Sequence, residues 1–252
     1  MSDILGVSSA RAAAELAPGG SLRAAINLGN PILARCDADT GAIGGVSVEL
    51  ARELGRRLSV AVKLVPFDAA GEVFAAIEAG AWDVAFLAID PLRATEIAFT
   101  APYVFIEGGY MVRDDSALVF VADVDRDDIT IAAGKDTAYE LYLRRNLKHA
   151  TLVDAPTSPA SVDLFLERRT DVVAGIRKPL VDLAATREGL RVLDGHFMVI
   201  EQAMGTLKGR DAGLRYLHGF IEEMKASGFV AEALARNGHD TALVAPMATG
   251  GP

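Results

Sequence analysis

The chain has 252 residues, 51% of them hydrophobic, and a formal net charge of -9 at pH 7. Acidic and basic residues are interspersed, which argues against nucleic acid or an anionic membrane surface as a partner. No apolar run reaches the roughly 18 to 20 residues that a membrane-spanning helix needs. These properties predict a soluble, well-packed chain that forms either one large α/β domain or two lobes of ordinary size.

Cysteine and histidine usage gives no sign of a metal or redox site. The single cysteine, Cys36, excludes an intramolecular disulfide, and no base stands beside it in the sequence to activate it as a nucleophile. The four histidines are scattered without the spacing of metal ligands. The glycine pair at 44–45 lacks the Lys and Ser/Thr of a phosphate-binding loop. We therefore expect no metal and no cofactor.

The N-terminal segment does not fit a secretory signal, because residues 1–20 contain one basic residue, Arg11, and no apolar core. This leaves the compartment open between a signal that was removed and residence in the cytoplasm. Residues 1–19 are interpreted as a loosely attached arm with one helix over Ser8 to Leu16. The helix-breaking sequence Pro18-Gly19-Gly20 ends the arm.

The next segment alternates strands and helices. The turn Gly29-Asn30-Pro31 places Asn30 and Ile32 at the carboxyl end of the first strand, and Phe67 directly follows the second. Hydrophobic periodicity indicates the helices. The elements expected here are strands over 22–28 and 60–65 and helices over 46–58 and 72–79.

The stretch from Asp83 to Tyr103 is the centre of the sequence. Its first part, 83–88, is almost entirely apolar, which is typical of a parallel strand covered on both faces. The strand breaks at Asp90-Pro91, and proline suits the first turn of a helix. We therefore expect Arg93 near a helix N-terminus beyond the carboxyl end of a strand, where an anion is favoured. Its guanidinium can bind a carboxylate through two parallel hydrogen bonds.

A family resemblance rests on this stretch. The sequence reads Pro91-x-Arg93 and then Phe99-Thr100-x-Pro102-Tyr103, and this pattern resembles the signature of the amino-acid-type (family 3) solute-binding proteins of ABC transporters. The resemblance extends more weakly over 22–237. It implies the type II periplasmic-binding-protein fold, in which two α/β lobes, each a mainly parallel sheet flanked by helices, are joined by two crossing segments. The expected boundaries are 20–106 with 199–252 for lobe 1, and 107–198 for lobe 2.

The resemblance also implies roles for residues of lobe 1. Arg93 would hold the α-carboxylate of the ligand. The loop with Asn30 and Ile32 would face the ligand, although the aromatic side chains usual in this loop are replaced by Ile32 and Leu33. Phe67 lies where family members place an aromatic residue against the ligand. Before Arg93 the chain is shorter than the family pattern, which leaves Ala88 and the carboxylate of Asp90 close to the guanidinium.

Lobe 2 is expected to repeat this design. The first crossing lies at 104–112, where Glu107-Gly108-Gly109 can absorb backbone rotation. The turn Lys135-Asp136-Thr137 opens a helix, so its free N–H groups can meet an anion or polar ligand atom. The turn is equally explained by Asp136 or Thr137 capping that helix. The other elements expected are strands over 110–113, 129–133, 151–153, 171–175 and 190–193 and helices over 138–148, 158–169 and 180–186.

The end of the strand over 171–175 bears on the ligand class. The resembled family usually has an aspartate here that receives the α-ammonium of the ligand, whereas this chain continues from Gly175 to Ile176 and Arg177. A standard α-amino acid would leave its ammonium unpaired, at a cost of several kcal/mol. This departure favours an organic anion, or an amino compound held by another acid such as Asp90 or Asp136.

The chain is expected to return to lobe 1 through a second crossing at 197–205, which carries Glu201 and Gln202 close to the hinge. Helices over 211–227 and 230–237 then pack onto lobe 1. The ligand would be gripped by Arg93 from one lobe and by the 135–137 turn and Gly175 from the other, so that binding favours a closed state.

Solute binding is the first of three functions that the sequence suggests. The partners expected are a small amino acid or organic acid and an ABC permease, and the chain is expected to be a monomer without enzyme activity. A second hypothesis is an enzyme of the cyclohexadienyl or arogenate dehydratase type, with Glu107, Lys135, Asp136 and Glu201 as candidate proton donors. A cytoplasmic ligand sensor is an alternative form of the first hypothesis, in which the same closure serves a protein that is not exported. The third, the effector domain of a LysR-type regulator, is disfavoured because no helix-turn-helix segment of about sixty residues precedes Leu22.

Overall fold

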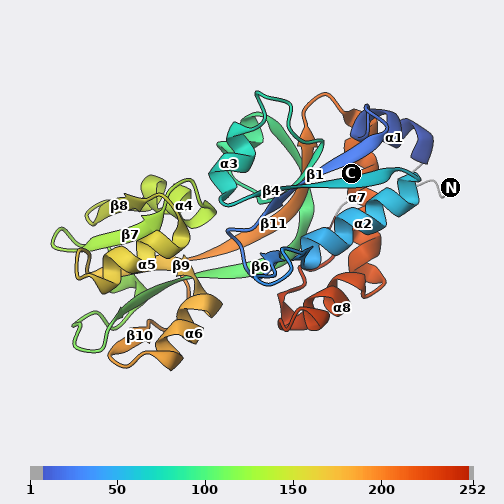
Figure 1. Cartoon of the computed structure of the whole chain (residues 1–252). Helices are drawn as coiled ribbons and strands as arrows, with labels where there is room; N and C mark the ends of the chain where they lie inside the picture. Colours follow the sequence, from blue (N-terminus) through green and yellow to red (C-terminus); the bar gives the residue numbers. More distant parts are fainter. Residues whose placement is uncertain (1–7, 250–252) are drawn as a thin grey trace. The chain divides into compact units, whose positions relative to one another are not determined.

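The chain divides into two compact units. The computed structural model describes residues 8–249. Unit 1 comprises Met1–Phe105 and Glu201–Pro252, and unit 2 comprises Ile106–Ile200. The chain passes from one unit to the other within the strands β6 (Ile97–Arg113) and β11 (Met198–Leu207) (Figure 1). Each unit has its own hydrophobic core.

Unit 1 is built on a mainly parallel set of strands. Its other elements are α1 (Ser9–Leu16), β1 (Ser21–Asn27), β2 (Arg35–Cys36), β3 (Ile43–Gly44), α2 (Val46–Leu58), β4 (Ala61–Phe67), α3 (Ala70–Ala75), β5 (Val84–Ala88), α7 (Asp211–Ala226) and α8 (Phe229–Arg236), with 3-10 turns at Arg93–Thr95 and Thr241–Leu243. The strand order is β4-β1-β5-β11-β6. β1 is parallel to β4 and β5, whereas β11 is antiparallel to β5. All five residues of β5 are buried, as its apolar sequence predicts.

The helix over Val46–Leu58 is confirmed with the predicted bounds, and it packs on β1 and β4 with its leucines buried. The helix expected over 72–79 is instead the shorter α3, because the chain turns out of it at Ala76. Below α3, Trp82 is buried and donates its indole N–H to the carbonyl of Val73 at 2.8 Å. No helix among residues 8–249 has both the length and the apolar character to cross a membrane.

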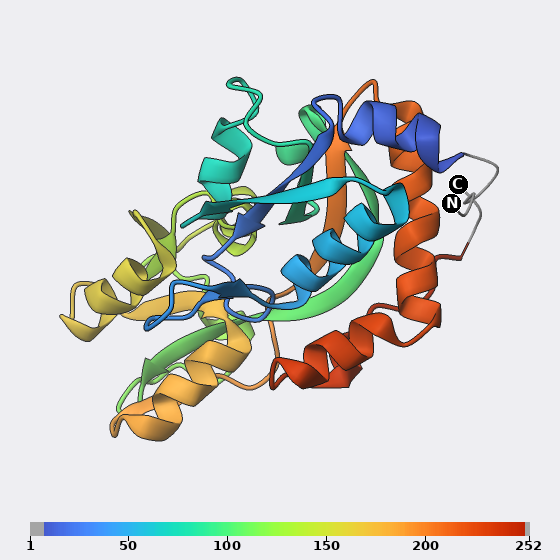
Figure 2. The same ribbon diagram turned by 45° about the vertical axis from the view of Figure 1, so that its right-hand side comes forward.

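The expectation of a loosely attached arm is wrong for α1, which packs tightly on α7 (Figure 2). Leu16 is fully buried, and the Glu15 carboxylate accepts the backbone N–H of Gly213 at 2.8 Å. A Cβ added to Gly213 would lie 2.7 Å from Leu16 Cδ2, so a larger residue would force the buried Leu16 side chain to shift. Residues 1–7 of the predicted arm lie outside the described residues.

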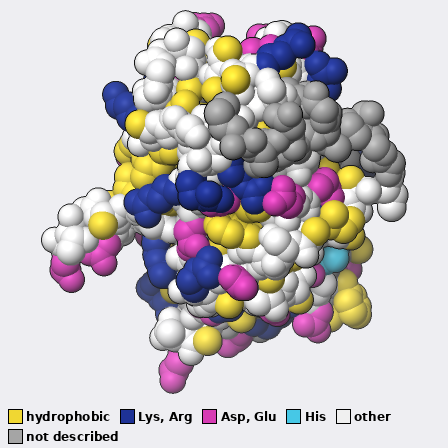
Figure 3. All heavy atoms as spheres, turned by 90° about the vertical axis from the view of Figure 1, so that its right-hand side faces the viewer, with side chains coloured by type: hydrophobic (Ala, Val, Ile, Leu, Met, Phe, Trp, Pro, Cys, Tyr) yellow, Lys and Arg dark blue, Asp and Glu magenta, His cyan; other side chains and the backbone are white. Residues whose placement is uncertain are grey.

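The helical surface of unit 1 carries charges of both signs side by side (Figure 3). Arg57 on α2 pairs with Glu223 on α7 at 2.6 Å, and Arg236 on α8 pairs with Glu49 on α2 at 2.6 Å. These pairs join helices that are far apart in the sequence. The interspersed charges of the sequence therefore form local pairs on this face.

Unit 2 repeats the α/β design. Its other elements are β7 (Thr130–Gly134), α4 (Ala138–Asn146), β8 (Thr151–Ala155), α5 (Ser158–Leu166), β9 (Val172–Ile176), α6 (Arg177–Thr186) and β10 (Leu190–Val192), with a 3-10 turn at Val121–Asp123. The strand order is β6-β9-β7-β8, and β10 pairs with β6. β7 is parallel to β8 and β9, and β6 is antiparallel to β9. The core gathers around Phe165 of α5, which is fully buried.

Gly108 and Gly109 lie within β6, where they pair with Ile176 and Gly175 of β9. A Cβ on Gly108 would lie 2.9 Å from Met198 Cγ, and a Cβ on Gly109 would lie 3.0 Å from Arg177 Cγ. The structure therefore gives a reason for these glycines that the sequence does not: a Cβ at either position would crowd a neighbouring side chain, which would have to shift.

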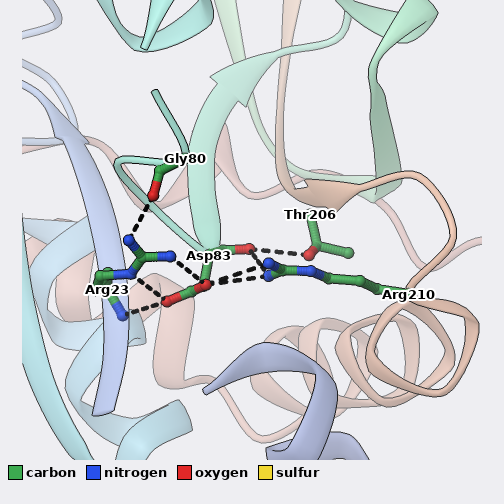
Figure 4. A network of polar contacts seen from close by, with 5 residues as sticks. All are labelled: Arg23, Gly80, Asp83, Thr206 and Arg210. Atoms are coloured by element: carbon green, nitrogen blue, oxygen red, sulfur yellow. Dashed lines mark hydrogen bonds and ion pairs between the residues drawn. The ribbon is translucent and has the colours of Figure 1, made fainter. Parts of the chain in front are cut away.

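The amino end of β5 is fixed by a buried carboxylate (Figure 4). Asp83 has no exposed side-chain surface, and its two oxygens accept Nε and Nη2 of Arg23 at 2.8 Å each. Arg210, which immediately precedes α7, reaches the same carboxylate at 3.3 Å. The backbone carbonyl of Asp83 accepts the hydroxyl of Thr206 on β11 at 2.9 Å. One residue thus joins β1, β5, β11 and the start of α7.

The ionised state of Asp83 is a contribution to stability. Burial alone would raise the pKa of this carboxyl, but the hydrogen bonds and charge of Arg23, with the charge of Arg210, hold the pKa below its ordinary value. A carboxyl with a lowered folded-state pKa stabilises the fold above its unfolded pKa of about 4, and this contribution is lost as the pH falls through the folded value.

We expect Asp83→Asn to lower the free energy of unfolding by about 3 kcal/mol at neutral pH, because two guanidinium groups lose their shared acid. Urea unfolding measured across the acid range should show the difference between variant and wild type shrinking below about pH 4. Asp68→Asn, at an exposed position of unit 1, is the control. A difference that stays constant down to low pH would contradict this account.

Candidate functional site

The carboxyl end of β5 brings several predicted site residues together in unit 1. Ala88, the last residue of β5, pairs with Gln202 of β11. The next backbone N–H, that of Ile89, donates to the carbonyl of Glu201 at 2.9 Å. The side chain of Arg93 also reaches the end of β5, where its Nη1 donates to the carbonyl of Ala88 at 3.0 Å. The pairing of β5 with β11 therefore gathers Ala88, Gln202 and Arg93 at one sheet edge.

Arg93 is 2% exposed, an unusual degree of burial for a guanidinium. The prediction that it stands near the N-terminus of a regular helix is wrong. The chain forms only the three-residue 3-10 turn Arg93–Thr95, since Thr95 and Glu96 hydrogen-bond three residues back, to Leu92 and Arg93. A single such turn has no sizeable dipole, so the position and charge of Arg93 itself provide the attraction for an anion.

Asp90 orders the turn that carries Arg93. Its Oδ1 accepts the backbone N–H of Leu92 at 2.8 Å, and its carbonyl accepts the N–H of Ala94 at 2.8 Å. This is an aspartate hydrogen-bonding its own backbone two residues on, a common turn device. Asp90 is 2% exposed, so the turn holds a buried carboxylate as well as a buried guanidinium.

The other candidates of unit 1 lie at the carboxyl ends of β1 and β4. Asn30 is buried, and its side-chain oxygen accepts the N–H of Ile32 at 3.2 Å, so it shapes its own turn. Ile32 is 3% exposed and belongs to the core. Phe67 is the last residue of β4, and its half-buried ring packs against the cluster around Trp82. Packing accounts for the positions of Ile32 and Phe67 before any ligand is considered.

In unit 2, the turn Lys135-Asp136-Thr137 follows β7 directly. Thr137 is the N-cap of α4: its Oγ1 accepts the N–H of Glu140 at 3.2 Å and donates to the carbonyl of Gly134 at 2.8 Å. Asp136 has a left-handed backbone with φ of 57°, and its N–H donates to the Glu140 carboxylate at 3.0 Å. The capping role predicted for Thr137 is confirmed.

Gly175 lies on β9 one residue before its end and pairs with Gly109. Because β7 and β9 are parallel and in direct register, Gly175 and the turn after β7 lie at the same edge of the sheet. Arg177, the first residue of α6, donates Nε to the carbonyl of Gly195 at 3.0 Å. The structure therefore brings the unit 2 candidates together at the carboxyl edge.

A polar cluster at this edge was not predicted as a unit. Glu107 of β6 lies 3.3 Å from His196 Nδ1 and 3.8 Å from Arg177 Nε. Its partners follow some 70 and 90 positions later in the chain, so no local pattern joins them. Glu107, one of the four predicted proton-donor candidates, has a histidine at ion-pair distance.

An aromatic pair lies beside the same cluster. The rings of Tyr110 and Phe197 stack at 4.4 Å between centroids, and the Phe197 N–H donates to the carbonyl of Gly108 at 3.0 Å. Burial raises the pKa of the Tyr110 hydroxyl, so this group stays protonated at neutral pH. Among residues 8–249, no group of three or more His, Cys, Asp and Glu side chains is placed to hold a metal ion.

Comparison with known sequences identifies a family. Residues 23–239 match the family described as bacterial extracellular solute-binding proteins, family 3. A related protein is the L-cystine-binding protein TcyJ of Escherichia coli strain K12, which is 24% identical over 193 residues covering 75% of this chain and 72% of TcyJ.

Solved structures give the same fold. AbpA from Streptococcus pneumoniae, an amino acid ABC transporter substrate-binding protein bound to L-arginine, matches with a TM-score of 0.75 and 20% identity over 88% of this chain and 96% of AbpA. The ancestral amino acid-binding protein AncCDT-1, a precursor of cyclohexadienyl dehydratase, matches with a TM-score of 0.74 and 20% identity over 88% of this chain and 97% of its own. The predicted type II periplasmic-binding-protein fold is confirmed.

The capping role of Thr137 can be separated from a ligand contact. Thr137→Ala should lower the free energy of unfolding by about 1 kcal/mol because α4 loses its N-cap, whereas Thr137→Ser keeps the hydroxyl and should cost much less. Chemical denaturation measures both variants. Equal losses for the two variants would show that the hydroxyl does not act as the cap.

Proposed function

Because the chain belongs to the bacterial extracellular solute-binding proteins of family 3, we propose that it binds a small carboxylate-bearing solute, an amino acid or a close relative, for uptake by an ABC permease. The observation that carries this proposal is the buried guanidinium of Arg93 at the carboxyl end of β5. Arg93 Nη1 is held by the Ala88 carbonyl, and this contact orients the plane of the guanidinium. An oriented guanidinium is suited to a carboxylate because its parallel N–H groups match two oxygens.

The ligand-binding set that we propose combines both units. Unit 1 would contribute Arg93 with the backbone at Ala88 and the amide of Gln202, and unit 2 the turn after β7 and the end of β9. Contacts made by both units exist only in a closed state, so the solute would favour closure of the lobes 20–106 with 199–252 and 107–198. A permease would then distinguish loaded from empty protein. The protein would act as a monomer in this scheme.

The solute class follows from the charges at the two sheet edges. TcyJ is an L-cystine-binding protein and the structure of AbpA contains bound L-arginine, and both of these ligands are amino acids. Ile176 provides no acid for an α-ammonium, but Glu107 on the neighbouring strand β6 is half exposed at the same edge. An amino acid is therefore the first solute class to test, and a plain organic acid is the second.

A thermal-shift screen with amino acids and small organic acids should find a stabilising solute, and Arg93→Lys should weaken its binding about 10- to 100-fold. The lysine keeps the positive charge, so the fold is retained while the paired N–H groups are lost. Arg210→Lys is the matched control, because Arg210 is a mostly buried arginine of unit 1 outside the proposed set.

Isothermal titration with the solute found in the screen then gives the affinities. The expected outcome is a weakened Arg93→Lys variant beside an Arg210→Lys variant with wild-type affinity and reduced stability. Wild-type affinity of Arg93→Lys would overturn the proposed role of this arginine. Absence of any stabilising acid would overturn the solute class.

The likeness to AncCDT-1, a precursor of cyclohexadienyl dehydratase, gives one alternative function a specific basis. A dehydratase needs a proton donor over a bound carboxylate, and the best-placed pair for this role is Glu107 beside His196. We infer that the chain binds without turnover. The protein should consume neither prephenate nor arogenate during incubation. Consumption of either compound by the wild type, but not by Glu107→Gln, would establish the dehydratase function instead.

A further inference from the structure

Unit 2 contains a cavity of about 230 Å³ at the edge opposite the candidate site. We call it the amino-edge cavity, because it lies where β7 and β9 begin and where the antiparallel β6 ends. It is lined by Arg113, Asp115, Ser116, Ala117, Leu118, Arg126, Asp128, Ile129, Arg168 and Asp171. The five-residue strand β7 separates it from the turn at Lys135, which corresponds to a distance on the order of 13 to 17 Å. The cavity is therefore separate from the proposed solute site.

The lining of the amino-edge cavity includes a fixed cation. Arg113 donates to the backbone carbonyls of Phe165 and Thr170, and its guanidinium carbon lies 4.5 Å from the centroid of the Phe165 ring. These contacts immobilise the side chain but provide no negative charge. No acid among the described residues forms an ion pair with Arg113, so its charge is available to an anionic group in the cavity.

Arg168 is a second cation in the lining of the cavity, and it ends a helix with a left-handed backbone. It follows the end of α5 with φ of 58°, and the bonds Arg168 N–H to Phe165 carbonyl and Arg169 N–H to Leu164 carbonyl close the helix. Glycine is the usual residue at such a left-handed helix end, because a Cβ is strained there. In this chain the position is occupied by Arg168, an exposed residue whose side chain lines the cavity without an ion-pair or hydrogen-bond partner among the described residues.

Two exposed carboxylates line the same cavity as these cations. Asp115 forms no hydrogen bond or ion pair with any described residue. Asp171 uses one oxygen to accept the backbone N–H of Thr130 at 2.9 Å, and it has no basic partner among the described residues. The other two charged lining residues, Arg126 and Asp128, form an ion pair with each other at 3.3 Å, so their charges cancel. The cavity thus offers two unpaired charges of each sign.

We propose that the amino-edge cavity binds a small zwitterion, such as a free amino acid, that carries one carboxylate and one ammonium group. Arg168 and Arg113 receive the carboxylate, and Asp115 and Asp171 receive the ammonium. A simple anion would be repelled by the aspartates and a simple cation by the arginines, so only a ligand with both charges is matched. The volume is below the roughly 300 to 1,000 Å³ of pockets for drug-sized ligands, which restricts the ligand to small metabolites.

The test uses the full chain labelled with nitrogen-15 and titrated with glycine, L-alanine, L-lysine and L-glutamate. At least one of them should shift the backbone amide signals of Ala117, Ile129 and Asp171. Arg168→Gly should weaken that binding about tenfold or more, while the melting temperature rises because the helix end is relaxed. If Arg168 only stabilised the fold, its replacement would lower the melting temperature. Weaker binding together with a higher melting temperature would therefore indicate that Arg168 acts in binding.

Ser59→Gly is the matched control, because Ser59 has a φ of 57° at the C-cap of α2 in unit 1. It should raise the melting temperature in the same way and leave the cavity signals unchanged. Arg93→Lys should also leave them unchanged, which separates this site from the proposed solute site. Asp115→Asn should weaken binding of the zwitterion through its ammonium.

Three results would overturn the proposal. The first is the absence of shifts at the cavity amides with all four amino acids, which would leave the charged groups as a solvated surface. The second is wild-type binding by Arg168→Gly. The third is equal binding of glycine and of acetate, which has a carboxylate but no ammonium, since the cavity would then be a plain anion site.

Discussion

The buried carboxylate of Asp83 is the interaction on which the geometry of unit 1 depends. It binds Arg23 from β1 and Arg210 from the start of α7, while its backbone carbonyl binds Thr206 of β11. β5 is thereby tied to both neighbouring strands at its amino end. The strand is only five residues long and fully buried, so this anchor lies one short strand away from the carboxyl end of β5. The arginine of the proposed solute site stands at that other end.

This arrangement explains why a buried guanidinium can be kept at the carboxyl end of β5. The pairing of Ala88 with Gln202 and the turn shaped by Asp90 fix the backbone on both sides of Arg93. The Ala88 carbonyl then takes one of its N–H groups. Unit 2 reaches a similar layout by other means, since Thr137 caps α4 directly after β7. Each unit thus presents polar groups at the carboxyl ends of its parallel strands, where α/β sheets bind ligands.

The local features of this fold could be predicted from the sequence because their signals are local. The helix Val46–Leu58 and the buried run of β5 follow from hydrophobic periodicity, and Arg93 was placed correctly beyond the end of that strand. The prediction of a helix after Pro91 was wrong, because proline permits a helical first turn but does not require further turns. What the sequence lacked was any sign that the Asp90 side chain would hold a short 3-10 turn instead.

The interactions that set the tertiary structure escaped prediction because their partners are distant in the chain. Asp83 and its partner Arg210 are separated by 127 positions, and the packing of α1 on α7 joins residues almost 200 apart. The left-handed backbone of Arg168 was equally hidden, since arginine gives no signal for a helix end that usually calls for glycine. Residue spacing reports which face a side chain occupies, but it does not report which distant element covers that face.

The central claim is that Arg93 binds the carboxylate of the solute. The most direct test is a double-mutant cycle that compares the stabilising amino acid with its amide, in which the carboxylate is neutral, on wild type and on Arg93→Lys. The account predicts a coupling energy of about 1.5 to 3 kcal/mol. Replacing the acid by its amide should weaken binding strongly to the wild type, where the carboxylate pairs with Arg93, and only slightly to Arg93→Lys, where that pairing is already lost. If Arg93→Lys weakened the acid and the amide equally, Arg93 would not contact the carboxylate, and the account would be contradicted.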